Sequence, residues 1–383
     1  VRHHTVNAPG IAVRLVACTL VLSACAEPAA DSATDESSHV ELIEIARIGT
    51  LDGAPEFQFS SPSANIVVDH EAGEVFVAEP QTREIRVFSL SGEFLRRFGR
   101  AGDGPGEFDE APTFAVARDT VVALDRSRLH FFDRSGEVLQ TTRVSTVDGL
   151  PLPFGVSADS AGFVGWFMES DPYDADAGPF ERMYRIDPVD ASLGEPVVEI
   201  EHDQTALGLF AEQTRMVHAG DSFVRTIGDG YELGVLSLEG WPVDTLRFEW
   251  EPVPVPSDAF ESFATARRSA CDEAEDPAQC LRSAERQIER YRDRPIPDLR
   301  PVIGGLTGSP DGLVLVLRAD LDPAPHASGT RTRRDLVSTF GELLAELDLP
   351  DGFRPRWFSR DEIWGFELDE FDVPYVVGYE MRR

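Results

Sequence analysis

The sequence contains no lysine, so its 35 basic side chains are all arginines. Without lysine the chain cannot form a Schiff base with a carbonyl substrate, and it cannot complete a Walker phosphate loop, which ends in Gly-Lys-Ser or Gly-Lys-Thr. The arginines face 68 aspartates and glutamates, which gives a formal net charge of −33. A surface this acidic repels nucleic acid, so we expect no nucleic-acid partner unless arginines gather locally.

Motifs of the common hydrolytic and metal-dependent enzymes are also missing. No Gly-x-Ser-x-Gly turn occurs, the signature that exposes a nucleophilic serine in α/β-hydrolases. From His39 onward the histidines are scattered, and none has the HxH or HExxH spacing that brings two imidazoles onto one metal ion. These absences leave little support for an enzyme.

The stretch GRAGDGPGEF, residues 99–108, has the glycine density of a phosphate-binding loop. Its details do not fit, because Gly106 is followed by Glu107 rather than lysine, and the third glycine of a dinucleotide loop would also fall at Glu107. A related stretch, GTLDGAPEFQF, occupies residues 49–59. We therefore interpret both as crossovers between repeated units, with Phe108 packed between them.

The first 24 residues are typical of a secretory signal. Basic residues precede an apolar run, IAVRLVACTLVLSA, that is too short and too interrupted to span a membrane. The run ends in Leu22-Ser23-Ala24-Cys25, which resembles the lipobox of bacterial lipoproteins. This resemblance implies cleavage of residues 1–24 and a lipid on Cys25. A plain signal peptide with a chance cysteine is the alternative.

The residues after the signal predict a tether and a location. Residues 25–40 lack aromatic side chains and are rich in Ala, Ser, Asp and Glu, as in a solvated linker. More than one acyl chain on Cys25 would anchor the protein stably. We therefore expect a cell-envelope protein whose membrane partner is reached through Cys25 and whose folded part, residues 41–383, faces the periplasm or the cell exterior.

Two cysteines remain in the folded part, Cys271 and Cys280. They lie nine residues apart within SACDEAEDPAQC. An exported chain meets an oxidising compartment, which favours a disulfide between them. A metal site is the alternative, although no histidine lies near them in the sequence.

A repeated pattern organises the rest of the chain. The phrase Ser-Gly-Glu-apolar-Leu occurs at residues 88–98 and 132–142, with variants at 186–198, 236–248 and 340–347. Each copy has alternating apolar residues on both sides of a glycine turn, the signature of a β-hairpin. A second type of hairpin alternates with these, at residues 65–79, 113–125, 154–167, 215–227, 303–318 and 356–368.

Two hairpins per unit give four strands per unit, and six units predict an all-β fold, a six-bladed β-propeller. Successive turns lie about 40 to 60 residues apart except once, where about 90 residues intervene. Residues 257–294 account for the excess, because their apolar residues recur at helical spacing. Asp276 and Pro277 break this run into two helices, so we expect an α-helical hairpin insertion stapled by its cysteines.

The last unit supplies three strands where four are needed. An alternating segment near the N-terminus, residues 41–48, is available as the missing strand. We predict that it forms the outer strand of the blade completed by residues 354–382. Strands from both chain ends would then close the ring and remove an edge prone to aggregation.

GPGEF followed by a strand and by IRVFSLSGEFLRRFG resembles the NHL-type repeat and the broader TolB-like six-bladed propellers. The stretches RPVIGGLTGSPDGLVLV and FGELLAELDLPDGFRPRWF are more similar still to a group of exported bacterial six-bladed propellers. The likeness covers residues 42–383 apart from the helical insertion. It implies the fold and is nearly silent on function.

Enzymatic propellers of these kinds hold a cation at the mouth of the central channel, lactonase-like members with Glu, Asn and Asp and amidating lyases with histidines. Asn65 is the only asparagine after the signal, and no residue here can be carried over onto either set. A cation-dependent hydrolase or lyase stays as the alternative function. The acidic stretch DPYDADAGPF, residues 171–180, could bind Ca²⁺ weakly, with a solvated loop as the other interpretation.

Four arginines lie just before or inside predicted inner strands: Arg215, Arg300, Arg354 and Arg356. In so acidic a chain, arginines at the channel mouth would attract a carboxylate or a phosphate. Pairing with neighbouring Asp and Glu is the alternative. The function that we expect is therefore a ligand-binding or protein-interaction scaffold, with a protein or a small anionic ligand as its partner.

Overall fold

A computed structural model describes the chain from Val40 onward, and every described residue belongs to one compact unit, Ser37–Arg383. The predicted signal, Cys25 and the tether up to residue 39 lie outside the described residues, as do residues 171–179 of the acidic stretch. The described ranges are 40–62, 64–125, 128–143, 153–168, 180–187, 189, 192–201, 209–210, 214–228, 230–272, 274, 276–321 and 333–383.

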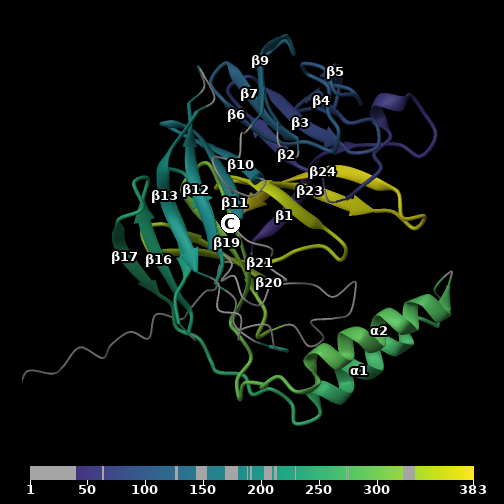
Figure 1. The fold of residues 1–383 in the computed structure, drawn as a ribbon, viewed down its shortest axis with the longest axis vertical. Coiled ribbons are helices and arrows are strands. Elements are labelled where there is room, and N and C mark those ends of the chain that lie inside the picture. Colours follow the sequence, from purple (N-terminus) through teal and green to yellow (C-terminus); the bar gives the residue numbers. More distant parts are fainter. Residues whose placement is uncertain are drawn as a thin grey trace, which may run out of the picture. The chain divides into compact units, whose positions relative to one another are not determined.

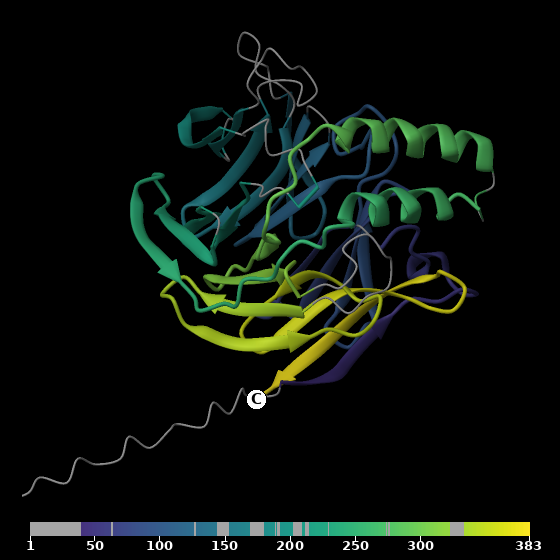
Figure 2. The same cartoon turned by 90° about the horizontal axis from the view of Figure 1, so that it is seen from below.

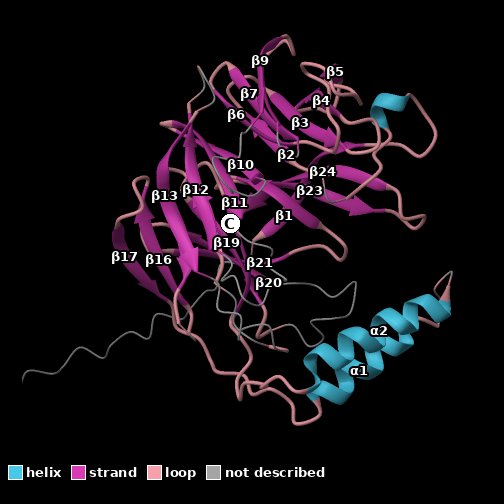
Figure 3. Ribbon diagram, in the orientation of Figure 1, coloured by secondary structure: helices cyan, strands magenta, loops and turns pink. Residues whose placement is uncertain are grey.

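The described residues form six antiparallel sheets of four strands each, which we number as blades 1 to 6 (Figure 3). The first two strands of each blade are β2 (Ile66–Asp69) and β3 (Glu74–Glu79), β6 (Thr113–Ala117) and β7 (Thr120–Asp125), β10 (Pro153–Asp159) and β11 (Gly162–Met168), β14 (Met216–Ala219) and β15 (Ser222–Thr226), β18 (Ile303–Gly308) and β19 (Leu313–Arg318), and β22 (Arg354–Phe358) and β23 (Glu362–Leu368). The other two are β4 (Glu84–Ser89) and β5 (Phe94–Phe98), β8 (Arg128–Asp133) and β9 (Val138–Arg143), β12 (Phe180–Ile186) and β13 (Leu193–Glu201), β16 (Glu232–Ser237) and β17 (Pro242–Arg247), β20 (Arg333–Ser338) and β21 (Leu343–Asp348), and β24 (Pro374–Arg382) with β1 (Glu41–Ile48).

The repeated Ser-Gly-Glu phrase is the turn between the third and fourth strands of a blade. Gly92, Gly136 and Gly341 occupy this turn in blades 1, 2 and 5, with φ values of 89°, 92° and 90°. A residue with a Cβ rarely adopts these angles, so the turn requires glycine. In blade 2 the Asp133 carboxylate also accepts a hydrogen bond from the Glu137 N–H at 2.9 Å, which closes the turn. The phrase recurs because each blade needs the same turn.

Neighbouring blades pack through buried apolar side chains, and these contacts run around the whole ring. Phe76 of blade 1 meets Phe114 of blade 2 with ring centroids 6.4 Å apart. On its other side blade 1 meets blade 6, where Phe59 and Phe366 lie 6.1 Å apart. Further buried clusters join blades 2 and 3, 3 and 4, 4 and 5, and 5 and 6. The six-bladed propeller predicted from the repeats is therefore confirmed, with each first strand innermost, since β2 contacts β22 and β14 contacts β18.

The ring is closed by strands from distant parts of the chain. The sixth sheet has the order β1-β24-β23-β22, and Glu41 pairs with Arg382 while Ile48 pairs with Val376. Figure 1 shows β1, in purple, beside the yellow strands at the other end of the colour scale. The predicted closure by residues 41–48 is confirmed.

A helical hairpin enters the chain between blades 4 and 5. It consists of α1 (Ala259–Ser269) and α2 (Pro277–Arg292), which lie side by side in Figure 2 and contact each other. The Asp276 carboxylate caps α2 by accepting a hydrogen bond from the Gln279 N–H at 2.9 Å. Cys271 and Cys280 form a disulfide with Cα atoms 5.5 Å apart, so both the predicted break and the predicted bridge are confirmed. No helix among the described residues is long and apolar enough to cross a bilayer.

Candidate functional site

Many buried charged side chains lie at one end of the ring, which we call the entry end. It is the end at which the innermost strand of each blade begins. Because the strands are antiparallel, the second strand ends there and the third begins there. Side chains at the boundary between the second and third strands therefore also lie at the entry end.

In blade 1 these side chains form a closed network. Arg86, with 2% of its side chain exposed, donates through Nε to Glu84 Oε1 at 2.8 Å. Its Nη1 donates to the backbone carbonyl of Glu56 at 3.2 Å, in the crossover that the sequence places at residues 49–59. The Glu79 carboxylate accepts from the N–H of Ser60 at 3.1 Å, just after the same crossover. A buried cation and two carboxylates thus fasten the crossover to the blade.

Blade 2 repeats this arrangement with different residues. The Asp125 carboxylate, fully buried, accepts from the backbone N–H groups of Asp109 and Glu110 at 2.7 and 2.8 Å. It also lies 2.6 Å from Nη2 of Arg128. These N–H groups directly follow GRAGDGPGEF, so the glycine-rich stretch is a crossover held by a carboxylate. The interpretation that it is not a phosphate loop agrees with this geometry.

His130 completes the network of blade 2. Its Nδ1 accepts the Gly106 N–H at 3.2 Å, and its ring packs edge-on against Phe108 with centroids 5.2 Å apart. Burial, together with the positive charge of Arg128, lowers the pKa of His130 to about 4, although Asp125 opposes the shift. The imidazole is therefore neutral at neutral pH, and its lone pair serves the crossover. Phe108 is fully buried, as predicted.

In blade 5 the buried arginine pairs with two carboxylates of its own blade, and a tyrosine of blade 4 joins this network. Arg318 lies 2.8 Å from Asp320 and 2.9 Å from Asp335. The Tyr231 hydroxyl of blade 4 donates to Asp335 at 2.8 Å, and burial followed by the Asp335 charge raises the pKa of this phenol. In these networks each buried arginine lies beside a carboxylate, so the networks stabilise the fold.

Three arginines of blades 4, 5 and 6 differ from this pattern. The Nε atoms of Arg225, Arg334 and Arg356 are buried without a hydrogen-bond partner. None of the three forms an ion pair with any side chain of the described ranges, and Arg356 donates to the Pro62 carbonyl at 3.0 Å. We call Arg225, Arg334 and Arg356 the uncompensated arginines.

The uncompensated arginines are half-buried at the entry end, and Arg225 and Arg334 share strand faces with residues that pack between blades. Arg334 lies two residues before Leu336, so both side chains share one face of β20, and Leu336 packs in a cluster with Phe358 of blade 6. Arg225 is paired across strands with Met216, which packs with residues of blade 3. Burial lowers the pKa of Arg334 to about 10, and burial with the nearby Arg354 charge lowers that of Arg356.

The sequence-predicted arginines fall into two groups. Arg354 and Arg356 share β22, and the charge of Arg354 reaches Arg356. Arg300 lies with its guanidinium 5.9 Å above the Phe210 ring, and burial lowers the pKa of Arg215. Arg215 and Arg300 have interaction partners of their own, so they are not among the uncompensated arginines.

Arg225 and Arg334 are not among the arginines predicted from the sequence, because neither lies near the start of an inner strand. A signal for both exists in the sequence. Each lies two residues from a large apolar residue that faces inward, Phe223 for Arg225 and Leu336 for Arg334. An arginine in phase with the buried face of a strand predicts a buried cation.

No group of three or more His, Cys, Asp or Glu side chains in the described part of the chain is arranged to hold a metal ion. All the acidic residues of the stretch 171–180 lie outside the described part, so the Ca²⁺ interpretation stays a prediction.

A family model described as a 6-bladed beta-propeller matches residues 37–170. Among solved structures, a Bacteroides fragilis protein described as exported is 11% identical, with 91% of this chain and 97% of that chain covered and a TM-score of 0.49. A member of the DUF4221 family from Bacteroides vulgatus is 12% identical, with 91% and 99% covered and a TM-score of 0.49. No curated protein sequence matches the chain. Identities and TM-scores this low carry no argument about function.

Proposed function

We propose that the chain is an extracytoplasmic, lipid-anchored β-propeller that binds a small anionic ligand at the entry end of blades 4 to 6. The observation that carries this proposal is the set of uncompensated arginines, Arg225, Arg334 and Arg356, in a chain whose net charge is −33. Carboxylates are abundant in this chain, yet none of the described ones pairs with these three cations. The lipobox at Cys25 and the disulfide of the helical hairpin support the location.

The energetics favour an anion. Burying a guanidinium without a partner is unfavourable, and the lowered pKa of Arg334 expresses this cost. A carboxylate or phosphate bound at the site offsets the unfavourable free energy of burial through charge-assisted hydrogen bonds. These are about twice as strong as neutral hydrogen bonds. The planar guanidinium suits both anions because its N–H groups form a fork.

The test compares anions at constant ionic strength. Inorganic phosphate and citrate should raise the melting temperature of the wild-type chain by roughly 2–4 °C beyond sodium chloride, the size expected for an anion near ten times its Kd. The double variant Arg334→Gln, Arg356→Gln should lose this increase. A matched control is Arg247→Gln with Arg382→Gln, because both arginines are exposed and paired with surface glutamates.

The control variant should retain the wild-type increase. If neither anion exceeds chloride on the wild-type chain, or if both double variants respond like the wild type, the arginines of the entry end do not form an anion site and the proposal is wrong.

A further inference from the structure

The outward face of α2 carries a line of arginines. Arg282, Arg286 and Arg290 are four residues apart, so they lie on one face of the helix, and all three are exposed. The opposite face carries Ala284 and Ile288, which are buried. We call Arg282, Arg286 and Arg290 the arginine stripe.

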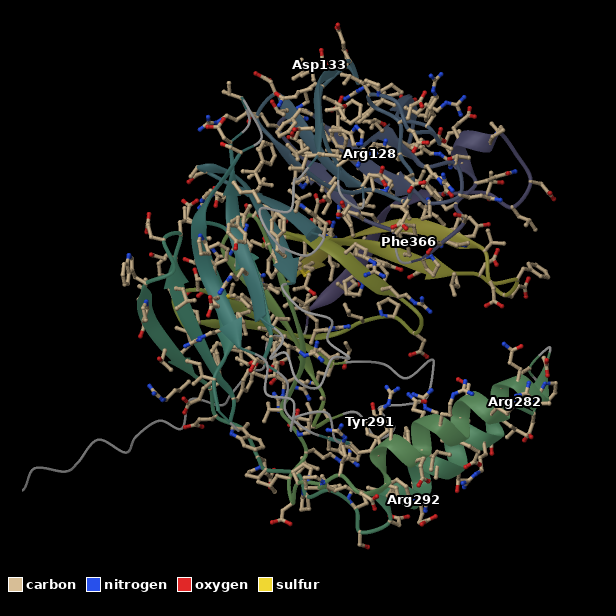
Figure 4. The ribbon with its side chains drawn as sticks, viewed as in Figure 1. Arg128, Asp133, Arg282, Tyr291, Arg292 and Phe366 are labelled. Carbon is tan, nitrogen blue, oxygen red and sulfur yellow. A yellow bond between two sulfur atoms is a disulfide. The ribbon has the colours of Figure 1, made fainter. Side chains whose placement is uncertain are left out.

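Among the described residues the arginine stripe forms no ion pair, whereas Arg268 and Arg292 of the same hairpin do. Arg268 lies 2.7 Å from Glu285, and Arg292 lies 2.8 Å from Glu289. No hydrogen bond or ion pair joins a stripe side chain to any other described residue. Glu285 and Glu289 lie on the same helix, but they pair with Arg268 and Arg292 rather than with the stripe. Figure 4 shows Arg282 toward the far end of the hairpin and Arg292 at the opposite end of α2.

The shape of this face indicates the kind of partner. Three cations extend along about 12 Å of a convex helix surface, at 1.5 Å per residue. A convex line of charge cannot enclose a small molecule, but it can lie along a flat surface of negative charge. We propose that the arginine stripe docks on the anionic phospholipid headgroups of the bilayer that holds the Cys25 anchor. This inference rests on the lipid anchor of the proposed function.

Charge distribution gives the docking a direction. The chain as a whole carries a net charge of −33, so most of its surface is repelled by anionic headgroups. At physiological ionic strength charges act over only about 8 Å, so the few groups nearest the bilayer decide the interaction. The arginine stripe is a place where those groups are cationic and unpaired. Docking through it turns the helical hairpin toward the membrane.

The first experiment removes the anchor and tests the stripe alone. The mature chain, from residue 25 onward and with Cys25→Ser, is floated with vesicles of phosphatidylcholine, or of phosphatidylcholine with phosphatidylglycerol, at low ionic strength. Each arginine near an anionic surface raises partitioning about fivefold. The triple variant Arg282→Gln, Arg286→Gln, Arg290→Gln should therefore partition about a hundredfold less onto the anionic vesicles.

The matched control removes three other exposed arginines, as Arg97→Gln, Arg247→Gln and Arg382→Gln. It should partition like the Cys25→Ser parent, and 0.5 M sodium chloride should abolish binding of both. Absence of binding to anionic vesicles, or an equal loss in the two triple variants, overturns the proposal.

A second measurement uses the acylated chain without any stripe substitution. An arginine-specific dicarbonyl reagent should modify Arg282, Arg286 and Arg290 at least threefold more slowly on anionic vesicles than on neutral ones, with Arg247 and Arg382 unchanged. Equal rates overturn the docking. If this chain floats with neither vesicle, the anchor of the proposed function fails, and the Cys25→Ser chain still decides the stripe.

Discussion

Blades 1 and 2 use the entry end differently from blades 4 to 6. In blade 1 Arg86 is buried beside Glu84, and in blade 2 Arg128 lies against Asp125. Backbone N–H groups after each crossover donate to a nearby carboxylate, Glu79 in blade 1 and Asp125 in blade 2. Arg225, Arg334 and Arg356 occupy the same end of later blades with buried Nε atoms that have no partner.

This difference separates the buried charges that stabilise the fold from those that do not. A buried cation within hydrogen-bond distance of a carboxylate and a crossover loop fastens one blade to the next, and its loss should be felt as instability. A buried cation without a carboxylate destabilises the chain by itself, and its replacement by an apolar residue should be tolerated or favourable. Stability measurements on the two groups should therefore have opposite signs.

The largest effect is expected at Asp125. Asp125→Ala leaves the Arg128 cation and two backbone N–H groups buried without their acceptor, which should lower the free energy of unfolding by about 3–5 kcal/mol. Chemical denaturation measures this loss. Asp103→Ala is the control, since its side chain lies near the same arginine but is 95% exposed, and it should change stability little. Similar losses in both variants would contradict the role of Asp125.

A slightly smaller effect is expected from pH at His130. The folded-state pKa of about 4 lies below the ordinary value of 6.5, so the unfolded chain binds the proton first. Stability from this residue is complete above pH 6.5 and is lost as the pH falls toward 4, by about 3 kcal/mol. His130→Gln keeps an acceptor for the Gly106 N–H and does not titrate. The free energy of unfolding of this variant should vary less between pH 6.5 and 4 than that of the wild type, and parallel curves would exclude His130 as the cause.

The smallest effect, and the one of opposite sign, is expected at Arg334. Arg334→Met keeps the length of the side chain and removes a buried charge, which should raise the free energy of unfolding by about 1–2 kcal/mol in phosphate-free buffer. Arg333→Met is the control, because the neighbouring arginine is more exposed and forms an ion pair with Glu346. The control should show no gain. A destabilised Arg334→Met chain would mean that Arg334 is compensated after all.

Much of the fold could be predicted because its signals are local. The turn glycines recur at the same step of each unit, and Asp276-Pro277 marks the start of α2 within a few residues. The closure by residues 41–48 could be predicted because the last unit has only three strands of its own. The networks could not be predicted in this way, because Asp125 meets Asp109 only after a blade has formed, and because the absence of a partner for Arg334 depends on every blade around it.

The pairing of β1 with β24 sets the order in which the protein can mature. Arg382 is translated long after Glu41, yet they are partners in the same blade. Until β24 emerges from the ribosome or the export machinery, β1 has no neighbour and the sixth sheet stays open. A chain that stopped before Pro374 would leave β1 unpaired, so the ring closes only once Pro374–Arg382 has been made.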